Sequence, residues 1–350
     1  MLGLSKSAHR EVMADRYIGP SQGRNKGSGN DQALAQSGDR GRNAEHPREL
    51  PTSGWRDILW RVKEETAKDN ISMIAAGVAF YLMLAIFPLL AATVSIYGLV
   101  ADPADVQRNF ESVAGVIPEQ ARSIMIDQLT AVSSASGGQL GFGVVLSLGL
   151  TLWSASRGVI AMITALNIAY DETESRSFVK LNAIALALTL AMIIFMIVTL
   201  AVVVGLPVVI GYLNLGETVE WVIRLARWPI LAVAVIVGLA VLYRYAPDRD
   251  APRWRWVSSG AVVATVIWLL GSIAFSVYVS NFADYNKTYG AMGAVIILLL
   301  WFNLSSYAVL LGAELNSEME HQTARDTTKG LERPLGQRRA YVADTVGRQP

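Results

Sequence analysis

The chain has 350 residues, of which 52% are hydrophobic and only 17% are charged, whereas ordinary soluble domains are about 25% charged. The net charge of +1 gives no basic field that would favour nucleic acid, and the lack of cysteine excludes disulfides, thiol catalysis and cysteine-ligated metals. The charge is also unevenly placed. Residues 1–70 hold 12 of the 30 lysines and arginines, whereas residues 181–211 hold no charge, which predicts a membrane protein.

The two ends of the chain are polar. Residues 1–52 are rich in Gly, Ser, Asn, Gln and Arg without apolar periodicity, and residues 319–350 have the same character. We expect both to be disordered cytoplasmic tails. Residues 1–52 also lack the features of a cleaved signal peptide, so the first internal apolar helix is expected to direct membrane insertion.

Residues 53–69 are predicted to form an amphipathic helix with Ser53 as its N-cap. Four apolar residues recur there at helical spacing, namely Trp55, Ile58, Leu59 and Val62. Because this segment directly precedes an apolar stretch, it could lie at the cytoplasmic membrane interface. Packing of the helix against a bundle explains the same pattern equally well.

Six apolar stretches follow within a predicted membrane domain, residues 70–318. They lie near residues 71–100, 140–169, 181–211, 228–245, 256–281 and 290–315. Crossing a bilayer takes about 20 apolar residues in a helix. The fourth stretch is the shortest, because Arg227 and Arg244 flank it. The predicted fold class is an all-α polytopic membrane helix bundle of about six transmembrane helices.

The distribution of lysine and arginine predicts the orientation of these helices. With six spans, one side holds both tails and the loops 170–180 and 246–255, and it carries 24 lysines and arginines when the boundary residue Arg244 is included. The opposite side carries five. Since basic residues are retained on the cytoplasmic side, both termini are predicted to be cytoplasmic.

Seven short motifs follow one another along the apolar region. They are AAGVAFY at 75–81, FP at 87–88, LWSASRG at 152–158, the pair Asn167 and Tyr170, YAP at 245–247, YNKTYGA at 285–291 and LGAELN at 311–316. Together they resemble the YihY/BrkB family of bacterial inner-membrane proteins over roughly residues 55–320. The resemblance implies six helices and a cytoplasmic-membrane location. Labels in that family include virulence factor and an older ribonuclease BN, and some relatives are considered lipid or lipopolysaccharide exporters.

The ribonuclease label finds no support in the residues. The three histidines, His9, His46 and His321, all lie in polar segments, and no HxH or HxxxH pair occurs that could hold a catalytic metal. GxSxG and phosphate-binding GxxxxGK motifs are also missing. We therefore expect no catalytic residue, no metal, no cofactor and no nucleic-acid partner, and we predict that the protein is not an enzyme.

Polar residues inside the apolar stretches are the candidates for function, because a charge in lipid is costly. Arg157 could face the bundle and line a substrate path, or it could extend to the cytoplasmic head groups. Asn303, Tyr307 and Glu314 lie on one face of the sixth stretch. Glu314 could pair with Arg157, or it could simply mark the end of the helix.

Asn286, Lys287 and Tyr289 form a candidate polar motif at the outer boundary of the membrane. Lys287 could attract an anionic head group, and an ordinary turn with an aromatic anchor explains the same residues. The predicted function is that of a non-enzymatic inner-membrane transporter or lipid- or lipopolysaccharide-handling protein, with membrane lipids as partners. The alternative is a structural or envelope-assembly protein.

Overall fold

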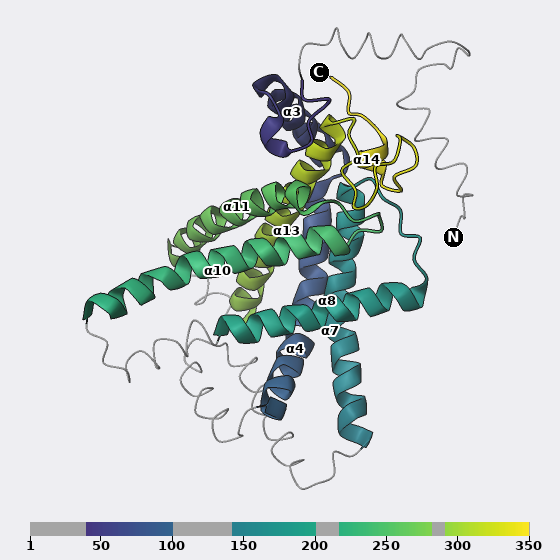
Figure 1. Ribbon diagram of the computed structural model, residues 1–350. Helices are drawn as coiled ribbons and strands as arrows, with labels where there is room; N and C mark the ends of the chain where they lie inside the picture. The colour runs from purple at the N-terminus through teal and green to yellow at the C-terminus, as the bar shows by residue number, and fades with distance from the viewer. Residues whose placement is uncertain (1–39, 101–141, 201–216, 282–290, 350) are drawn as a thin grey trace, which may run out of the picture. The chain divides into compact units, whose positions relative to one another are not determined.

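The computed structural model describes residues 40–100, 142–200, 217–281 and 291–349 (Figure 1). The described residues from Gly41 onward form one unit. These residues are helical and contain no strand, apart from an isolated bridge between Pro252 and Thr328. The all-α fold class predicted from the sequence is confirmed.

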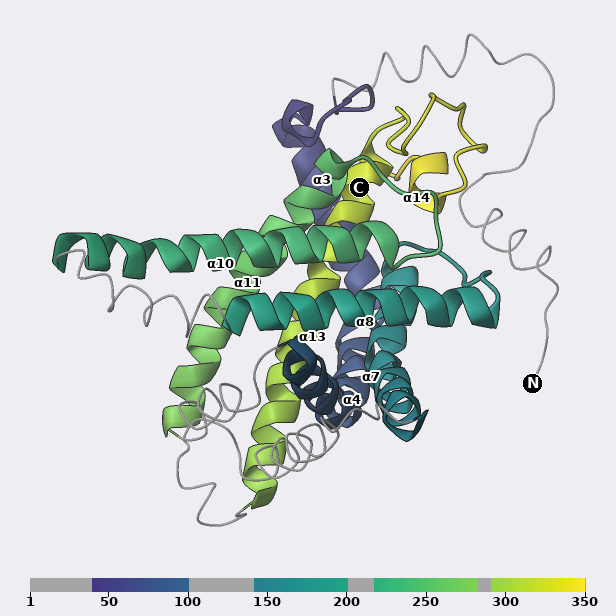
Figure 2. The same cartoon turned by 60° about the horizontal axis from the view of Figure 1, so that its bottom comes forward.

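Six long helices make up most of the described chain. They are α4 (Ile71–Val100), α7 (Phe142–Ala169), α8 (Phe178–Leu200), α10 (Glu217–Tyr245), α11 (Trp254–Asn281) and α13 (Ala291–Gln322). The amphipathic helix α3 (Thr52–Lys68) precedes them, and η1 (Pro47–Glu49) and α14 (Tyr341–Asp344) are short turns. α4 packs along α7, and α13 packs against both α4 and α11 (Figure 2).

Five of these helices are long and apolar enough to cross a membrane. Their apolar stretches are Ile71–Leu89, Gly149–Ala169, Phe178–Thr199, Trp254–Val279 and Val295–Gln322. The apolar part of α10, Pro229–Tyr245, is shorter. The chain is therefore a multi-pass helical membrane protein, and the sixth crossing predicted from the sequence depends on α10.

The helix ends differ from the predicted apolar stretches where polar residues continue a helix. α8 begins at Phe178 rather than at 181, because the exposed Lys180 lies within its first turn and does not interrupt it. α13 continues to Gln322 instead of ending at 315, and polar residues such as Asn316 and Glu320 are buried in this extension. Residues 201–211 of the third predicted stretch lie outside the described residues.

Helix α3 packs on α13 through a face that combines apolar and polar side chains. Ile58, Asp57 and Arg61 are all buried there. The amphipathic sequence pattern fits either an interfacial helix or a helix packed on the bundle. Because these residues are buried, the second interpretation applies to the inner face of α3. The predicted N-cap is wrong, because the helix begins one residue earlier, at Thr52, and Pro51 occupies the N-cap position.

Helices α11 and α13 cross at two glycines. A Cβ on Gly260 would collide with the carbonyl oxygen of Gly312, and a Cβ on Gly312 would lie 2.6 Å from the carbonyl oxygen of Gly260. Asn316 fastens the crossing: its Oδ1 accepts a hydrogen bond from the Gly260 N–H at 2.8 Å, and its Nδ2 donates to the Val257 carbonyl at 3.2 Å. The LGAELN motif thus serves helix packing.

We predict that Gly312→Ala destabilises the protein, because the added methyl group forces apart two helix backbones in contact. Overpacking of this kind should lower the free energy of unfolding by about 1–3 kcal/mol. Gly238→Ala on α10 is the matched control, since a Cβ there meets nothing within 4 Å. Thermal unfolding in detergent measures both, and equal unfolding temperatures would contradict the assigned crossing.

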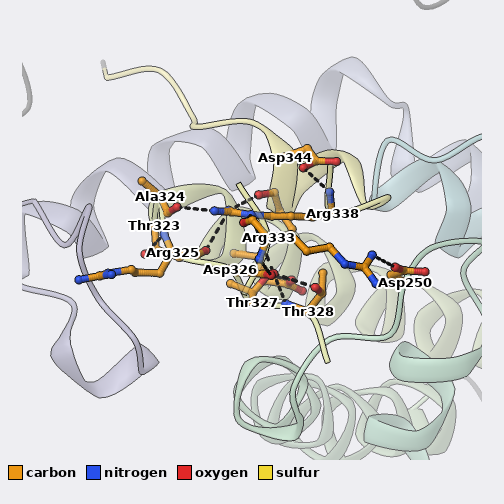
Figure 3. Close-up of polar contacts among 12 residues, drawn as sticks. Asp250, Thr323, Ala324, Arg325, Asp326, Thr327, Thr328, Arg333, Arg338 and Asp344 are labelled. Carbon is orange, nitrogen blue, oxygen red and sulfur yellow. Dashed lines mark hydrogen bonds and ion pairs between the residues drawn. The ribbon is translucent and has the colours of Figure 1, made fainter. Parts of the chain in front are cut away.

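Residues 323–349, here called the C-terminal cap, fold over one end of the helix bundle, next to α3 and the end of α13 (Figure 1). Val342 of the cap is buried in the main apolar core together with Tyr170 and Tyr243. Arg338 holds the coil of the cap together, and Figure 3 shows its side chain among the surrounding backbone. Its guanidinium donates to the carbonyl oxygens of Ala324, Arg325, Arg333 and Ala343 at 2.6–3.1 Å.

The predicted disorder of the two tails is wrong for their described residues: residues 319–322 belong to α13, and residues 41–52 and 323–349 are also folded. Near the N-terminus, Ala44 and Leu50 are buried against Trp256, and the carbonyl oxygens of Arg42 and Ala44 accept hydrogen bonds from the cap. These segments fold as coil through contacts with distant residues. Such contacts leave no periodic pattern in the sequence, which is why composition alone indicated disorder. Residues 1–39 lie outside the described residues.

We predict that Arg338→Ala unfolds the cap while the helices remain inserted. The change leaves several cap carbonyls without their charged donor, and it should cost at least about 2 kcal/mol. Arg325→Ala is the control, because that exposed side chain points away from the cluster in Figure 3. Hydrogen exchange of residues 323–349 should rise sharply in the first variant only; unchanged protection would disprove the role of Arg338.

Candidate functional site

Arg157, the basic candidate on α7, contacts α8 rather than α13. Its Nη2 donates to Oδ1 of Asn182 at 2.6 Å, and its guanidinium lies over the ring of Trp153 at 4.1 Å. Asn182 in turn donates to the carbonyl of Phe178 at 2.7 Å. The described residues show no ion pair between Arg157 and Glu314. Sequence reasoning missed Asn182, although it is a polar residue in an otherwise apolar stretch.

The three candidates on α13 have different surroundings. Asn303 is half-buried, and Tyr307 lines a pocket beside α3. Glu314 is only 1% exposed, and its Oε1 has no hydrogen-bond partner among the described residues. A buried carboxylate oxygen without a donor is energetically costly, so Glu314 is an unusual group for a membrane helix.

Other carboxylates act electrostatically on Glu314, from α3, from α13 and from the loop after α7. They belong to Glu65, Asp69, Asp171 and Glu318. Burial raises the pKa of Asp69 to about 6, and the negative charge of Asp171 adds to this shift. Burial likewise raises the pKa of Asp171. Asp69 and Asp171, at this end of the bundle, therefore resist ionisation.

One basic residue of α3 balances part of this negative charge. Arg61 forms an ion pair with Glu318 and donates to Oε1 of Gln322 at 2.7 Å. It also donates to the carbonyl of Arg348, in the cap, at 3.0 Å. A single side chain thus joins α3, α13 and the C-terminal cap. Among the described residues, no group of three or more His, Asp or Glu is placed to hold a metal ion.

The loops after α7 and α10 are joined by polar contacts that sequence reasoning did not find. Asn167 donates to Glu174 at 3.0 Å and accepts from the backbone N–H of Asp248 at 2.8 Å. Arg249 pairs with Glu320 at 2.6 Å and lies over the ring of Tyr170 at 4.9 Å. Asn167 and Tyr170 form one of the motifs noted above. They lie three residues apart at the end of α7, and this spacing lets both side chains contact the loop after α10.

Glu172 connects the loop after α7 to the cap. Its Oε1 accepts a hydrogen bond from the backbone N–H of Tyr341 at 2.7 Å. Burial raises the pKa of Glu172 to about 7, although the Tyr341 N–H works in the opposite direction. Glu174 behaves differently: burial is outweighed by its hydrogen bonds and ion pair with Arg176, which lower its pKa.

We predict that Glu172 makes the fold less stable as the pH rises from about 4.5 to about 7. Its pKa is higher in the folded than in the unfolded chain, so ionisation is penalised only after folding, and the penalty stays constant above pH 7. Glu172→Gln keeps an acceptor for Tyr341 and should gain up to about 3 kcal/mol at pH 7.5 with no gain at pH 4.5. Unfolding temperatures across this range measure the difference.

Glu174→Gln is the control for this experiment, because its folded-state pKa is lowered. The variant should lose stability relative to the wild type above about pH 4.5, the opposite sign. If Glu172→Gln and the wild type showed the same pH profile, the burial of the Glu172 carboxyl would be disproved.

The predicted outer motif, Asn286, Lys287 and Tyr289, lies outside the described residues. Its role therefore stays a prediction. The candidate site that the structure does describe lies at the opposite ends of the flanking helices, where α3, α13, the loop after α7 and the cap meet.

Comparison with known proteins agrees with a multi-pass membrane protein of this architecture. Residues 62–335 match the protein family described as Virulence factor BrkB, and the chain belongs to that family. The family resemblance noted from the sequence motifs is thereby confirmed. No solved structure matches the chain.

Among the relatives, the ribonuclease-like protein YfkH of Bacillus subtilis (strain 168) is 32% identical over 256 residues, covering 69% of this chain and 88% of the relative. A UPF0761 membrane protein of Alteromonas mediterranea is 28% identical over 273 residues, which is 75% of this chain and 88% of the relative. Another, from Rhodospirillum centenum, is 26% identical over 286 residues, covering 79% of this chain and 61% of the relative.

Proposed function

We propose that the protein transports or otherwise handles an amphiphilic substrate, either a lipid or a lipopolysaccharide, without being an enzyme. The observation that carries this proposal is Glu314, a buried carboxylate with a free oxygen in a membrane helix. A group of this kind does not stabilise the fold, because its desolvation is not repaid by a donor. Intramembrane ionisable residues of this type commonly line the path of a substrate or ion.

The position of Glu314 along α13 supports the same proposal. Leu310 and Ala313, on the preceding turn, are buried in the main apolar core, and Glu318, on the next turn, belongs to the polar contacts with α3. Glu314 therefore lies where a mainly apolar environment changes to a polar one. A transported amphiphile must likewise move between these two environments, because its head group is polar and its hydrocarbon chain is apolar.

A second candidate function is that of a structural or envelope-assembly protein. It is favoured by Arg157, which is bound by Asn182 and stacked on Trp153 as a brace between α7 and α8 would be. In that case the intramembrane polar residues would only hold helices together.

We further propose that the protein lies in the inner membrane with both termini in the cytoplasm. The basic segments before α4, after α7 and after α10 gather at one end of the unit with the cap, where Asp250 pairs with Arg333 and Glu172 contacts Tyr341. Such a gathering is expected if all of them remain on the cytoplasmic side. The relative named ribonuclease-like does not change our proposal that this chain is not an enzyme.

We predict that Glu314→Gln and Arg157→Ala separate the two functions. Glu314→Gln replaces a buried acidic group that has an unpartnered oxygen by a neutral amide of nearly the same shape, so its unfolding temperature should stay close to that of the wild type, while movement of a fluorescent phospholipid or lipopolysaccharide across proteoliposomes should fall at least about tenfold. Arg157→Ala loses a charged hydrogen bond and a stacking contact and should cost about 2 kcal/mol of stability.

Glu332→Gln, an exposed residue of the cap, is the control for loss of charge. The structural alternative predicts that wild-type proteoliposomes move no more lipid than protein-free liposomes. It also predicts that Glu314→Gln supports the same cell growth as the wild type. These two results together would overturn the transport proposal.

A further inference from the structure

A pocket of about 520 Å³ lies between α3, α4 and α13. It is distinct from the Arg157 contact and from the cap, and we call it the α3 pocket. Its lining residues are Leu59, Val62, Lys63, Thr66, Ala67, Asn70, Ser72, Tyr307 and Leu311. The volume is in the range of pockets that bind small molecules or the polar part of a larger one.

The α3 pocket lies at the boundary of the membrane. Asn70 and Ser72 in its lining stand on either side of Ile71, where the first apolar stretch begins. Large apolar side chains beside it are left uncovered by the protein: Leu59 is 58% exposed and Met73 is 75% exposed. Side chains of this type at this depth are covered by lipid in a membrane-spanning protein, so the pocket opens toward lipid.

The lining combines an apolar wall with polar groups, of which none is acidic among the described residues. Leu59, Val62 and Leu311 provide the wall. The polar groups are hydroxyl and amide side chains together with the positively charged Lys63. The one charged residue that lines the pocket in the described part of the chain is therefore a cation, which favours a negatively charged head group over a zwitterionic one.

Lys63 is the basic residue of this pocket. It is exposed and has no ion-pair partner among the described residues, whereas its neighbours on α3 are paired: Lys68 with Glu65, and Arg61 with Glu318. Thr66, one turn further along α3, has a hydroxyl group without a hydrogen-bond partner among the described residues. Lys63 is available to an occupant of the pocket, whereas the Thr66 hydroxyl oxygen is buried.

We propose that the α3 pocket binds the head group of an anionic glycerophospholipid. Lys63 pairs with the phosphate, and the exposed side chains of Asn70 and Ser72 hydrogen-bond to head-group oxygens. The acyl chains leave along Leu59 and Met73 into the bilayer. A free phosphate ion would use Lys63 but would leave the apolar wall facing water, so the lining favours a lipid. This site goes beyond the proposed function, because a bound lipid can fasten α3 to the membrane whether or not the protein transports anything.

The test uses the full chain, stripped of co-purified lipid in detergent, and native mass spectrometry with phosphatidylglycerol, phosphatidylcholine or inorganic phosphate. The wild type should retain a phosphatidylglycerol molecule in preference to phosphatidylcholine. Lys63→Glu should weaken this binding at least about fivefold, as expected for one cation at an anionic lipid surface. Leu311→Trp, which fills the pocket without changing charge, should also weaken it.

Arg56→Glu is the matched control, since Arg56 is an exposed cation of the same helix that does not line the pocket. It should bind phosphatidylglycerol as the wild type does, and the unfolding temperature of each variant confirms that it is folded. Equal binding by wild type and Lys63→Glu, equal losses in Lys63→Glu and Arg56→Glu, or equal retention of both lipids would overturn the proposal. So would competition by inorganic phosphate alone. None of these outcomes affects the transport proposal, which is tested through Glu314.

Discussion

The arrangement of the described helices depends on the contact between two backbones. At Gly260 and Gly312 the helices α11 and α13 approach so closely that no side chain fits between them, and Asn316 fastens them by bonding to the main chain of α11. Helix α13 also packs against α3, α4 and α7. Its position on α11 therefore determines where these three helices lie. In a membrane, where apolar side chains gain little by leaving lipid, such close packing replaces the hydrophobic effect as the source of specificity.

At the end of α13, arginines take over this organising role. Arg61 joins α3 to α13 and the cap, and Arg338 holds the cap through backbone carbonyls. Arg249 is buried against Glu320 and Tyr170. The planar, multidentate guanidinium suits a region with little regular structure, because one side chain can satisfy several carbonyl groups at once. The cost of burying it is offset only while all of these partners are in place.

The sequence was sufficient for the features that depend on periodicity. The first apolar stretch was predicted at 71–100 and α4 spans Ile71–Val100, and the all-helical class and the family followed from similar patterns and motifs. Prediction failed where a residue is placed by a distant partner. Asn182 could not be paired with Arg157 without knowing that α7 and α8 are neighbours, and the cap, whose coil is held by Arg338, has the composition of a disordered tail. Of the candidates, Glu314 was found because a single acid in an apolar helix is conspicuous, but its lack of a partner is visible only in three dimensions.

The contacts of the last residues have a consequence for biogenesis. Arg42 donates to the carbonyl of Gly347 at 2.6 Å, and Arg61 donates to that of Arg348. Residues before the first membrane helix thus form hydrogen bonds with residues after the last one. During synthesis, α3 leaves the ribosome long before its final acceptors exist, and its docking on the bundle can be completed only when the C-terminal segment arrives. In a chain that lacks this segment, the guanidinium groups of Arg42 and Arg61 are without these acceptors.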